Sequence, residues 1–415
     1  MEAASATNEG DARQATSKPT DISKEEDEEK GERTPLLTSA RDCSDIETGQ
    51  AGTILDRLTG RNKKPKDDID DDGVQTTYEV NNLATFRVFF QHSGTVLQNP
   101  VLWKETISTF CIYVALVWVF GHWRWEGFTA FVGKESTIRA FLSMFSNLIG
   151  LLLSFYTALN IGRWWSMRLA VQDLWNGATK LSVLLAHGVT SDKELLHSVQ
   201  RYARGSLFLI FAASQKVKDP ASAMVRRGLL TEDEAVQLNN LSDKGIFPQA
   251  SVPWAWLANA VSALHKQGLT MGPPHLCSLL AAVEQGRAGI NTIQTYIETP
   301  VPMSYLHILG LMVKTHNLFI AGLYGLICVM HLGGDRGTNE VAIGRTVFRA
   351  FFMPFLYNAL LIINVDLSNP FDGDVGDLSF RTFDRNIEAE ALTMIAASEY
   401  RPKWMQGRKY AAWEM

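Results

Sequence analysis

The chain has 415 residues, of which 46% are hydrophobic, and its formal net charge is −5 at pH 7. This mild acidity gives no reason to expect nucleic acid as a partner, because proteins that bind nucleic acid concentrate positive charge. The length would accommodate two or three soluble domains, yet the hydrophobic residues are gathered in a few long runs. This pattern predicts a membrane-embedded body attached to a polar tail.

Residues 1–75 are rich in Glu, Asp, Ser, Thr, Lys and Gly and contain almost no aromatic side chains. Such a segment cannot bury enough apolar surface to offset the entropy of ordering, so we expect a disordered, acidic tail in the cytosol. Within it, Glu32–Leu37 resembles an acidic dileucine sorting signal, although a chance match of six residues is the simpler explanation. Residues 401–415 form a second, shorter tail.

Four hydrophobic runs predict four membrane-spanning helices. They cover about 106–123, 140–162, 300–330 and 346–366. The distribution of basic residues around their ends places both termini in the cytosol. Apolar residues recur at helical spacing among charges over 166–296, which predicts a helical cytosolic part that 367–400 completes. Within 166–296, Ser191–Glu194 and Thr231–Glu234 have the spacing of capping boxes, which mark helix starts.

The second run is not an ordinary lipid-facing helix. No ionisable side chain lies between Arg139 and Arg163, but Ser, Thr and Asn recur through the run. Polar groups in lipid need a partner or water, so we expect one face to look at protein or at a pore. The run ends in Arg163-Trp164-Trp165, a cation and two indoles of the kind found where a helix reaches the headgroups.

The third run contains His307, Lys314 and His316, which are costly in hydrocarbon. Such residues usually face a cavity, a partner helix or an ion pathway. We expect them at the junction between the membrane and the cytosolic part rather than directly lining a pore.

An acidic, glycine-containing segment follows the fourth run. Its carboxylates are Asp366, Asp372, Asp374, Asp377 and Asp384. Gly373 and Gly376 can adopt positive φ and so allow a tight loop around a hard cation. Oxygen donors without His or Cys indicate Ca²⁺ rather than zinc. A solvated acidic turn is an equally good interpretation of the chemistry alone.

Two of these segments resemble the bestrophin family of pentameric anion channels. SFYTALNIGRWW, from Ser154 to Trp165, resembles the end of its pore-lining second helix. SNPFDGDVGDLSFRTFDRNIE, from Ser368 to Glu388, resembles its Asn-Pro-Phe-Gly signature and calcium clasp. VPWAWLANAV, from Val252 to Val261, is similar to a further family stretch, and the resemblance extends over about 78–401.

The resemblance implies where the pore narrows. The three neck positions of the family fall on Phe155, Leu151 and Asn147, of which Asn147 replaces an apolar residue by an amide. From the spacing alone, packing between helices would be the favoured interpretation of Phe155 and Leu151. The lower, cytosolic constriction of the family falls on Pro274.

The resemblance also implies a Ca²⁺ site. Aligned on Asn-Pro-Phe, the two clasp carboxylates fall on Asp374 and Asp377, and two carbonyl donors fall on Asp366 and Asn369. The family glycine after Phe is Asp372 here. Asp377-Leu378 resembles bacterial and plant members, several of which are not thought to be gated by Ca²⁺.

We therefore expect an all-α membrane protein that forms a homopentamer and conducts chloride, with bicarbonate as a further candidate, under Ca²⁺ control. A non-conducting scaffold of the same fold is the alternative. An enzyme is not expected, because the sequence has no HExxH motif, no GxSxG with partners and no P-loop. The tail favours the plasma membrane, with endolysosomal, vacuolar or thylakoid membranes as alternatives, and membrane lipid is an expected partner.

Overall fold

A computed structural model describes residues 66–69, 94–122, 135–189, 192–241, 245–332, 339–374, 376–400 and 402–404. All of them belong to one compact unit, Ile54–Met415. The predicted acidic tail lies outside the described residues apart from 66–69, and the predicted C-terminal tail apart from 402–404.

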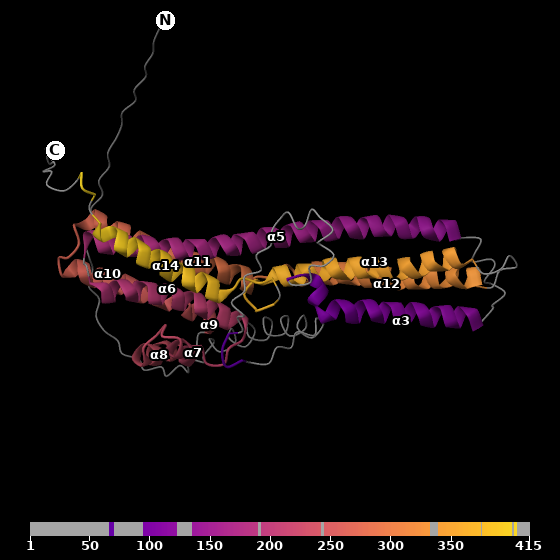
Figure 1. The fold of residues 1–415 in the computed structure, drawn as a ribbon, viewed down its shortest axis with the longest axis horizontal. Coiled ribbons are helices and arrows are strands. Elements are labelled where there is room, and N and C mark those ends of the chain that lie inside the picture. Colours follow the sequence, from indigo (N-terminus) through magenta and orange to yellow (C-terminus); the bar gives the residue numbers. More distant parts are fainter. Residues whose placement is uncertain are drawn as a thin grey trace, which may run out of the picture. The chain divides into compact units, whose positions relative to one another are not determined.

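Every named element of the described chain is a helix (Figure 1). In chain order these are η2 (Val96–Gln98), α3 (Pro100–His122), α5 (Glu135–Gly188), α6 (Lys193–Ser214), α7 (Pro220–Arg226), α8 (Glu232–Asn239), α9 (Ile246–Gln249), α10 (Val252–Lys266), α11 (Pro273–Glu298), α12 (Met303–Leu332), α13 (Glu340–Ser368) and α14 (Phe380–Glu399). The predicted all-α class is confirmed.

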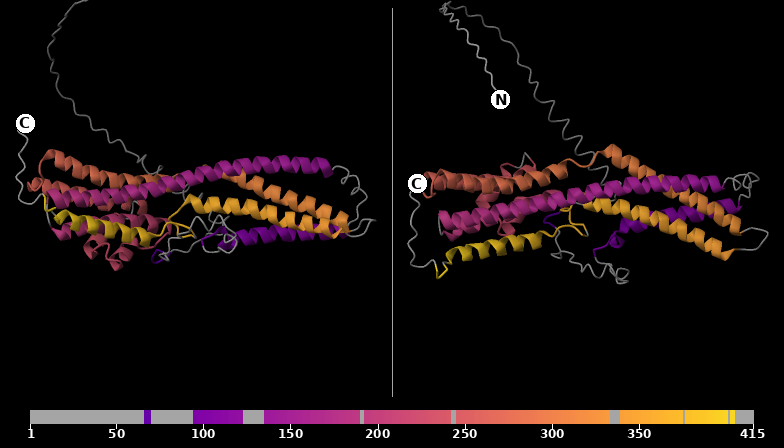
Figure 2. Two further views of the ribbon diagram at one scale, coloured as in Figure 1. Left: turned by 45° about the horizontal axis from the view of Figure 1, so that its top comes forward. Right: turned by 90° about the horizontal axis from the view of Figure 1, so that it is seen from above.

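Four of these helices are long and apolar enough to cross a membrane, as predicted: α3, α5, α12 and α13. In Figures 1 and 2, α12 and α13 lie beside the first half of α5, and the second half of α5 runs with α6, α11 and α14. Helix α3 packs on α12 and α13. The membrane part and the part that the sequence predicts to be cytosolic, called the cytosolic part below, therefore share one element, α5.

The predicted second span and the first cytosolic helix are one continuous helix of 54 residues. At 1.5 Å per residue, α5 is about 80 Å long, far more than a bilayer requires. The sequence predicted that the second span leaves the membrane at Arg163-Trp164-Trp165. A helix need not end where it leaves the hydrocarbon, and α5 continues to Gly188. No proline interrupts the chain there, and the single Gly162 is tolerated.

Three glycines allow α5 and α11 to lie unusually close. A Cβ atom added at Gly289 would lie 2.4 Å from the Ala170 carbonyl oxygen, and one at Gly177 would lie 2.6 Å from the Gly286 nitrogen. Gly286 is also covered by the ring of Trp254, which is fully buried. Backbone therefore packs on backbone in the cytosolic half of α5.

Aromatic residues form much of the cytosolic core. The Phe211 ring meets Phe371 edge to face, with centroids 5.1 Å apart, and it meets Phe380 in the same manner at 5.6 Å. All three phenylalanines are buried. Since Phe371 belongs to the Asn-Pro-Phe segment, this contact anchors the acidic loop on α6.

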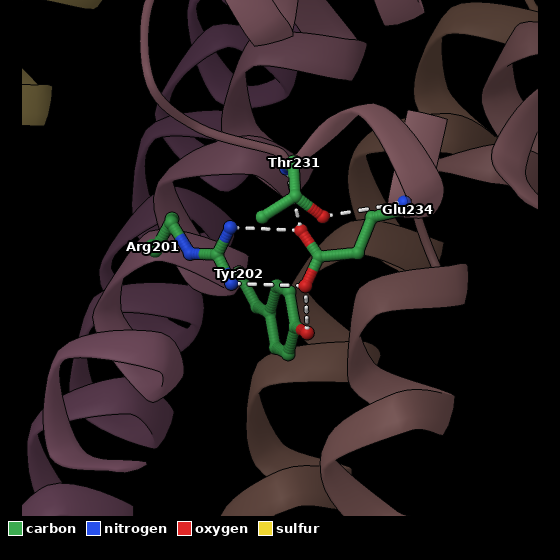
Figure 3. Close-up of polar contacts among 4 residues, drawn as sticks. All are labelled: Arg201, Tyr202, Thr231 and Glu234. Carbon is green, nitrogen blue, oxygen red and sulfur yellow. Dashed lines mark hydrogen bonds and ion pairs between the residues drawn. The ribbon is translucent and has the colours of Figure 1, made fainter. Parts of the chain in front are cut away.

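A polar cluster fixes α8 against α6 (Figure 3). The predicted capping box is present: the Thr231 hydroxyl accepts from the Glu234 N–H, and the Glu234 carboxylate accepts from the Thr231 N–H. Arg201 donates to both Glu234 oxygens at 2.8 and 2.9 Å, and the Tyr202 hydroxyl also donates to Glu234. The other predicted box was wrong in detail, because α6 is capped by Asp192.

These contacts alter the protonation of both partners. Burial, followed by the hydrogen bond to Glu234, raises the pKa of Tyr202 to about 12. Burial alone would raise the pKa of Glu234, but hydrogen bonds from Tyr202, the Thr231 N–H and Arg201 outweigh it and lower this pKa. Glu234 therefore stays ionised at neutral pH and holds α8 to α6.

The polar residues of the third span are paired inside the helix bundle. Lys314 Nζ lies 2.7 Å from Glu105 Oε2 of α3 and donates to Asn358 Oδ1 of α13 at 3.1 Å. His316 is fully buried, and its Nε2 lies 2.6 Å from the Ser146 hydroxyl of α5. Both residues lie well inside α12 and not at its cytosolic end, where the sequence had predicted them.

The glycine contact between α5 and α11 generates a test. Gly289→Ala should lower the free energy of unfolding by about 1–3 kcal/mol, because the added methyl group meets a backbone oxygen that cannot move freely. Gly344→Ala is the matched control, since nothing lies within 4 Å of a Cβ atom there. In that helix, alanine should be neutral or stabilising. Thermal unfolding of the two purified variants measures the difference, and equal melting temperatures would contradict the close approach.

Candidate functional site

The predicted neck residues lie on one face of α5. Asn147, Leu151 and Phe155 are spaced by four residues and are exposed in the single chain, Leu151 to 54% and Phe155 to 62%. Ile149, Leu153 and Tyr156, on the other side of the helix, are buried. The chain's own helices therefore cover the rear of α5 and leave the neck face uncovered.

This uncovered face is a continuous apolar strip, which we call the neck strip and define by Met144, Asn147, Leu148, Leu151 and Phe155. Its four apolar members are between 46% and 67% exposed. Asn147 has no hydrogen-bond partner among the described residues, so water or a second molecule must satisfy its amide. The arrangement shows that these residues are not packed within the chain itself. Their role as a pore neck stays a prediction.

Hydrogen bonds on the rear of α5 determine which face is turned outward. Asn160 Nδ2 donates to Asn364 Oδ1 of α13 at 3.0 Å, and Asn364 Nδ2 donates to the Thr157 hydroxyl at 2.8 Å. About three turns nearer the start of α5, the Tyr357 hydroxyl donates to the Ser146 carbonyl at 3.3 Å. Polar contacts in hydrocarbon are specific, so they fix the rotation of α5. The sequence showed the polar positions but not their partners.

Pro274 lies in the first turn of α11, two residues after the N-cap Gly272, whose φ is 133°. It is exposed. The next residue, His275, lies against Gly188 at the C-terminal end of α5. The two predicted constrictions are thus far apart, because Gly188, beside which Pro274 lies, is about 50 Å along α5 from Phe155.

The acidic loop brings three carboxylates together. Ligand oxygens of Asp372, Asp374 and Asp377 lie within 4.8 Å of one another. Gly373 and Gly376 have φ values of 83° and 95°, as the sequence predicted for a tight loop. Of the predicted carboxylate ligands, Asp374 and Asp377 are both present in this group. Asp372, which the alignment treated only as a departure from the family glycine, joins them.

Hydrogen bonds shape the loop before any cation binds. Asp377 Oδ2 accepts from the Gly373 and Asp374 N–H groups at 3.0 and 2.9 Å. The Leu378 N–H donates to the Pro370 carbonyl at 3.0 Å, which closes the loop. The structure therefore orients Asp377 through main-chain groups.

The predicted carbonyl donors lie at the end of α13. Asp366 is in its last turn, and Asn369 is its C-cap. Carbonyls at a helix C-terminus carry the negative end of the helix dipole and lack intrahelical partners, which suits a cation. The Asn369 side chain is used locally, because its Oδ1 accepts from the Phe371 N–H at 3.3 Å. Coordination by these two carbonyls stays a prediction.

The electrostatics of the loop fit a divalent cation. Burial, and then the neighbouring Asp372 carboxylate, raise the pKa of Asp377 well above its usual range. Three carboxylates at this separation repel one another, and a bound cation would neutralise them. The oxygen-only donor set suits Ca²⁺, and carbonyls or water would supply its remaining ligands.

This electrostatic cost generates a prediction for Asp377→Asn. Without Ca²⁺, the folded wild-type chain loses stability as the pH rises from the ordinary carboxylate pKa through the raised pKa of Asp377. The amide removes that loss, so the variant should melt at a higher temperature than wild type at pH 7 in chelator.

Added Ca²⁺ should favour wild type over the variant. It should stabilise wild type, by about 2.7 kcal/mol at a hundred times its Kd, and should stabilise the variant much less. Thermal unfolding with and without Ca²⁺ measures both effects. An equal Ca²⁺-induced shift in both proteins would show that Asp377 is not a ligand.

Comparisons with known proteins relate this chain to one family. The family model described as "Bestrophin, RFP-TM, chloride channel" matches residues 74–396. Human Bestrophin-2a is 23% identical over 303 residues, which are 71% of this chain and 57% of the human protein. The chain thus spans less than two thirds of the length of that relative.

Solved structures show the same fold. Two crystal structures of single-substitution variants of a bacterial bestrophin homologue from Klebsiella pneumoniae each give a TM-score of 0.56. They are 15% and 16% identical and cover 71% and 70% of this chain, and 98% and 97% of their own. Since the family model matches more than three quarters of the length of this chain, the chain belongs to the bestrophin family.

Proposed function

We propose that the chain is one subunit of a homopentameric anion channel in which five α5 helices surround an axial pore. The observation that carries the proposal is the uncovered neck strip, with Leu151 and Phe155 more than half exposed. One chain supplies one such helix, so a closed passage requires several copies. The description of the matching family as a chloride channel supports chloride as the conducted ion.

The chemistry of the neck strip suits the passage of anions. Narrow apolar constrictions gate by losing water, and the positive edge of an aromatic ring such as Phe155 can face an anion. Asn147 adds an amide at one level of the strip, which makes that level more permissive to water. Bicarbonate is a further candidate ion for the same passage.

Calcium control is part of the proposal. Asp374 and Asp377 would provide carboxylates, Asp372 a third, and the carbonyls of Asp366 and Asn369 further donors. The raised pKa of Asp377 supports a cation at this loop. We place the channel in the plasma membrane, and a fluorescent fusion protein would test that placement against an endolysosomal, vacuolar or thylakoid membrane.

Reconstitution of the purified chain into a planar bilayer with asymmetric chloride tests conduction. A channel should give a current that reverses near the chloride equilibrium potential, and replacing chloride by bicarbonate should give the relative permeability. The alternative is a scaffold of the same fold. Intact pentamers without current would favour the scaffold, and a monomer in a mild detergent would contradict the pore itself.

Leu151→Ala should raise the open probability by about tenfold, because the smaller side chain weakens dewetting at the neck; tenfold corresponds to roughly 1.4 kcal/mol. Leu318→Ala is the matched control, since Leu318 on α12 is 51% exposed but lies outside the neck strip. Single-channel recording measures both variants. An unchanged open probability in Leu151→Ala, or the same increase in Leu318→Ala, would contradict the neck assignment.

The double variant Asp374→Ala, Asp377→Ala should abolish the dependence of the current on Ca²⁺ while leaving chloride selectivity unchanged. Asp233→Ala, an exposed acid on α8, controls for a general loss of negative charge. Currents recorded over a Ca²⁺ titration measure the effect. A titration curve that matches wild type would remove Ca²⁺ gating from the proposal and leave conduction untouched.

A further inference from the structure

A cavity of about 500 Å³ lies between the cytosolic ends of α3, α5, α12 and α13, behind the neck strip. This volume is within the range of small-molecule sites, roughly 300–1,000 Å³. Val101 near the start of α3, Met303 at the start of α12 and Ser368 at the end of α13 all line it. The cavity therefore extends from the cytosolic ends of these helices into the membrane part.

The charges that line the cavity are unbalanced. Arg163 and Lys314 are cationic and Glu105 is the one acidic residue among the described lining residues. Glu105 pairs with Lys314 at 2.7 Å, whereas Arg163 has no ion pair among the described residues. Arg163 donates through Nη2 to the Tyr296 and Thr299 carbonyls, and its buried Nε has no partner there. One positive charge is thus left for an anion.

A second polar group at the deep end also lacks a partner. Asn358 is 2% exposed, and its Oδ1 accepts from Lys314 and Asn317. Its Nδ2 has no hydrogen-bond partner among the described residues, although the side chain lines the cavity. A buried donor of this kind costs about 1–3 kcal/mol unless an acceptor reaches it.

Between these two groups the walls are mostly apolar, although Asn160 and His307 also line the cavity. Leu306 and Leu311 of α12 face the cavity together with Leu361, Ile362 and Val365 of α13. The hydrogen bond from Asn160 to Asn364 shows that these two residues lie at the same height along α5 and α13. Arg163 follows Asn160 by three residues and Asn358 precedes Asn364 by six, so Arg163 and Asn358 lie about 13 Å apart along the helix axes. A bare inorganic anion would leave these walls in contact with water.

We propose that this cavity binds an amphiphile with a single anionic head group, the anion on Arg163 and the apolar chain along α12 and α13 towards Asn358. The ligand is a free fatty acid or an anionic phospholipid, which share this chemistry. Binding is measured without any current, so the proposal stands or fails independently of channel activity.

The probe is a palmitate that carries a photoreactive diazirine in its chain, used on the full chain in phosphatidylcholine nanodiscs. Mass spectrometry should find the label on peptides of α12 or α13 that line the cavity. Excess palmitate should reduce the labelling by about tenfold, and hexadecanol at the same concentration should not. Equal competition by hexadecanol would overturn the anionic head group.

Gly310 allows the cavity to be blocked without disturbing the fold. It lines the cavity, and nothing lies within 4 Å of a Cβ atom added there. Gly310→Leu should therefore fill the space and reduce labelling by about tenfold. Gly322→Leu is the matched control on the same helix, equally open but outside the cavity lining, and should label like wild type. Undiminished labelling of Gly310→Leu would overturn the site.

The head-group contact is tested separately. Arg163→Gln should remove the preference for palmitate over hexadecanol, and Arg163→Lys should retain it. If Arg163→Gln does not fold, the Gly310 pair still decides the site. Nanodiscs that contain phosphatidylglycerol distinguish the sources: loss of palmitate labelling indicates that the anionic phospholipid occupies the cavity, and undiminished labelling indicates that the free acid does.

Discussion

The close packing of α5 on α11 is the constraint on which the rest of the structure depends. Because glycines at 177, 286 and 289 remove side chains from the contact, the cytosolic half of α5 lies directly on the backbone of α11. The other half of the same helix carries the neck strip. A continuous helix does not bend easily without a proline or a comparable break, so a displacement at one end is transmitted to the other. One continuous helix therefore joins the membrane and cytosolic parts.

Polar side chains fix the rotation of α5 about its axis, although in a hydropathy profile they only lower the score of the span. Asn160 and Thr157 bond to Asn364, and Ser146 contacts His316 and Tyr357. Each of these groups would be costly in lipid without its partner. They turn the neck strip away from the chain's own helices, which leaves that face for lipid or for other copies of the chain. Under the proposed function, other copies of the chain cover this face and enclose water with it.

Much of this could be predicted from the sequence because it depends on local pattern. The lengths of the hydrophobic runs predicted the four spans, and the spacing of Thr231 and Glu234 predicted a capping box. Oxygen donors beside Gly373 and Gly376 indicated a loop that could bind a cation. The continuity of α5 was missed because Arg163-Trp164-Trp165 indicates only where the hydrocarbon of the membrane ends. The end of the hydrocarbon does not require the helix to end, and α5 continues to Gly188. The partners of Asn160, Lys314 and Asn358 were missed because they are 41 to 209 residues away along the chain.

The acidic loop and the neck strip are joined by a short series of contacts. Phe371 anchors the loop on Phe211 of the cytosolic core, and Asn369 caps α13 immediately before it. One turn further back, Asn364 holds Asn160 and Thr157, which is two residues from Phe155. A cation that orders the loop would stabilise the last turn of α13 and, through Asn364, one rotational setting of α5. Asn369 and Asn160 also line the cavity behind the neck strip, so a bound amphiphile would act on the same turn of α13.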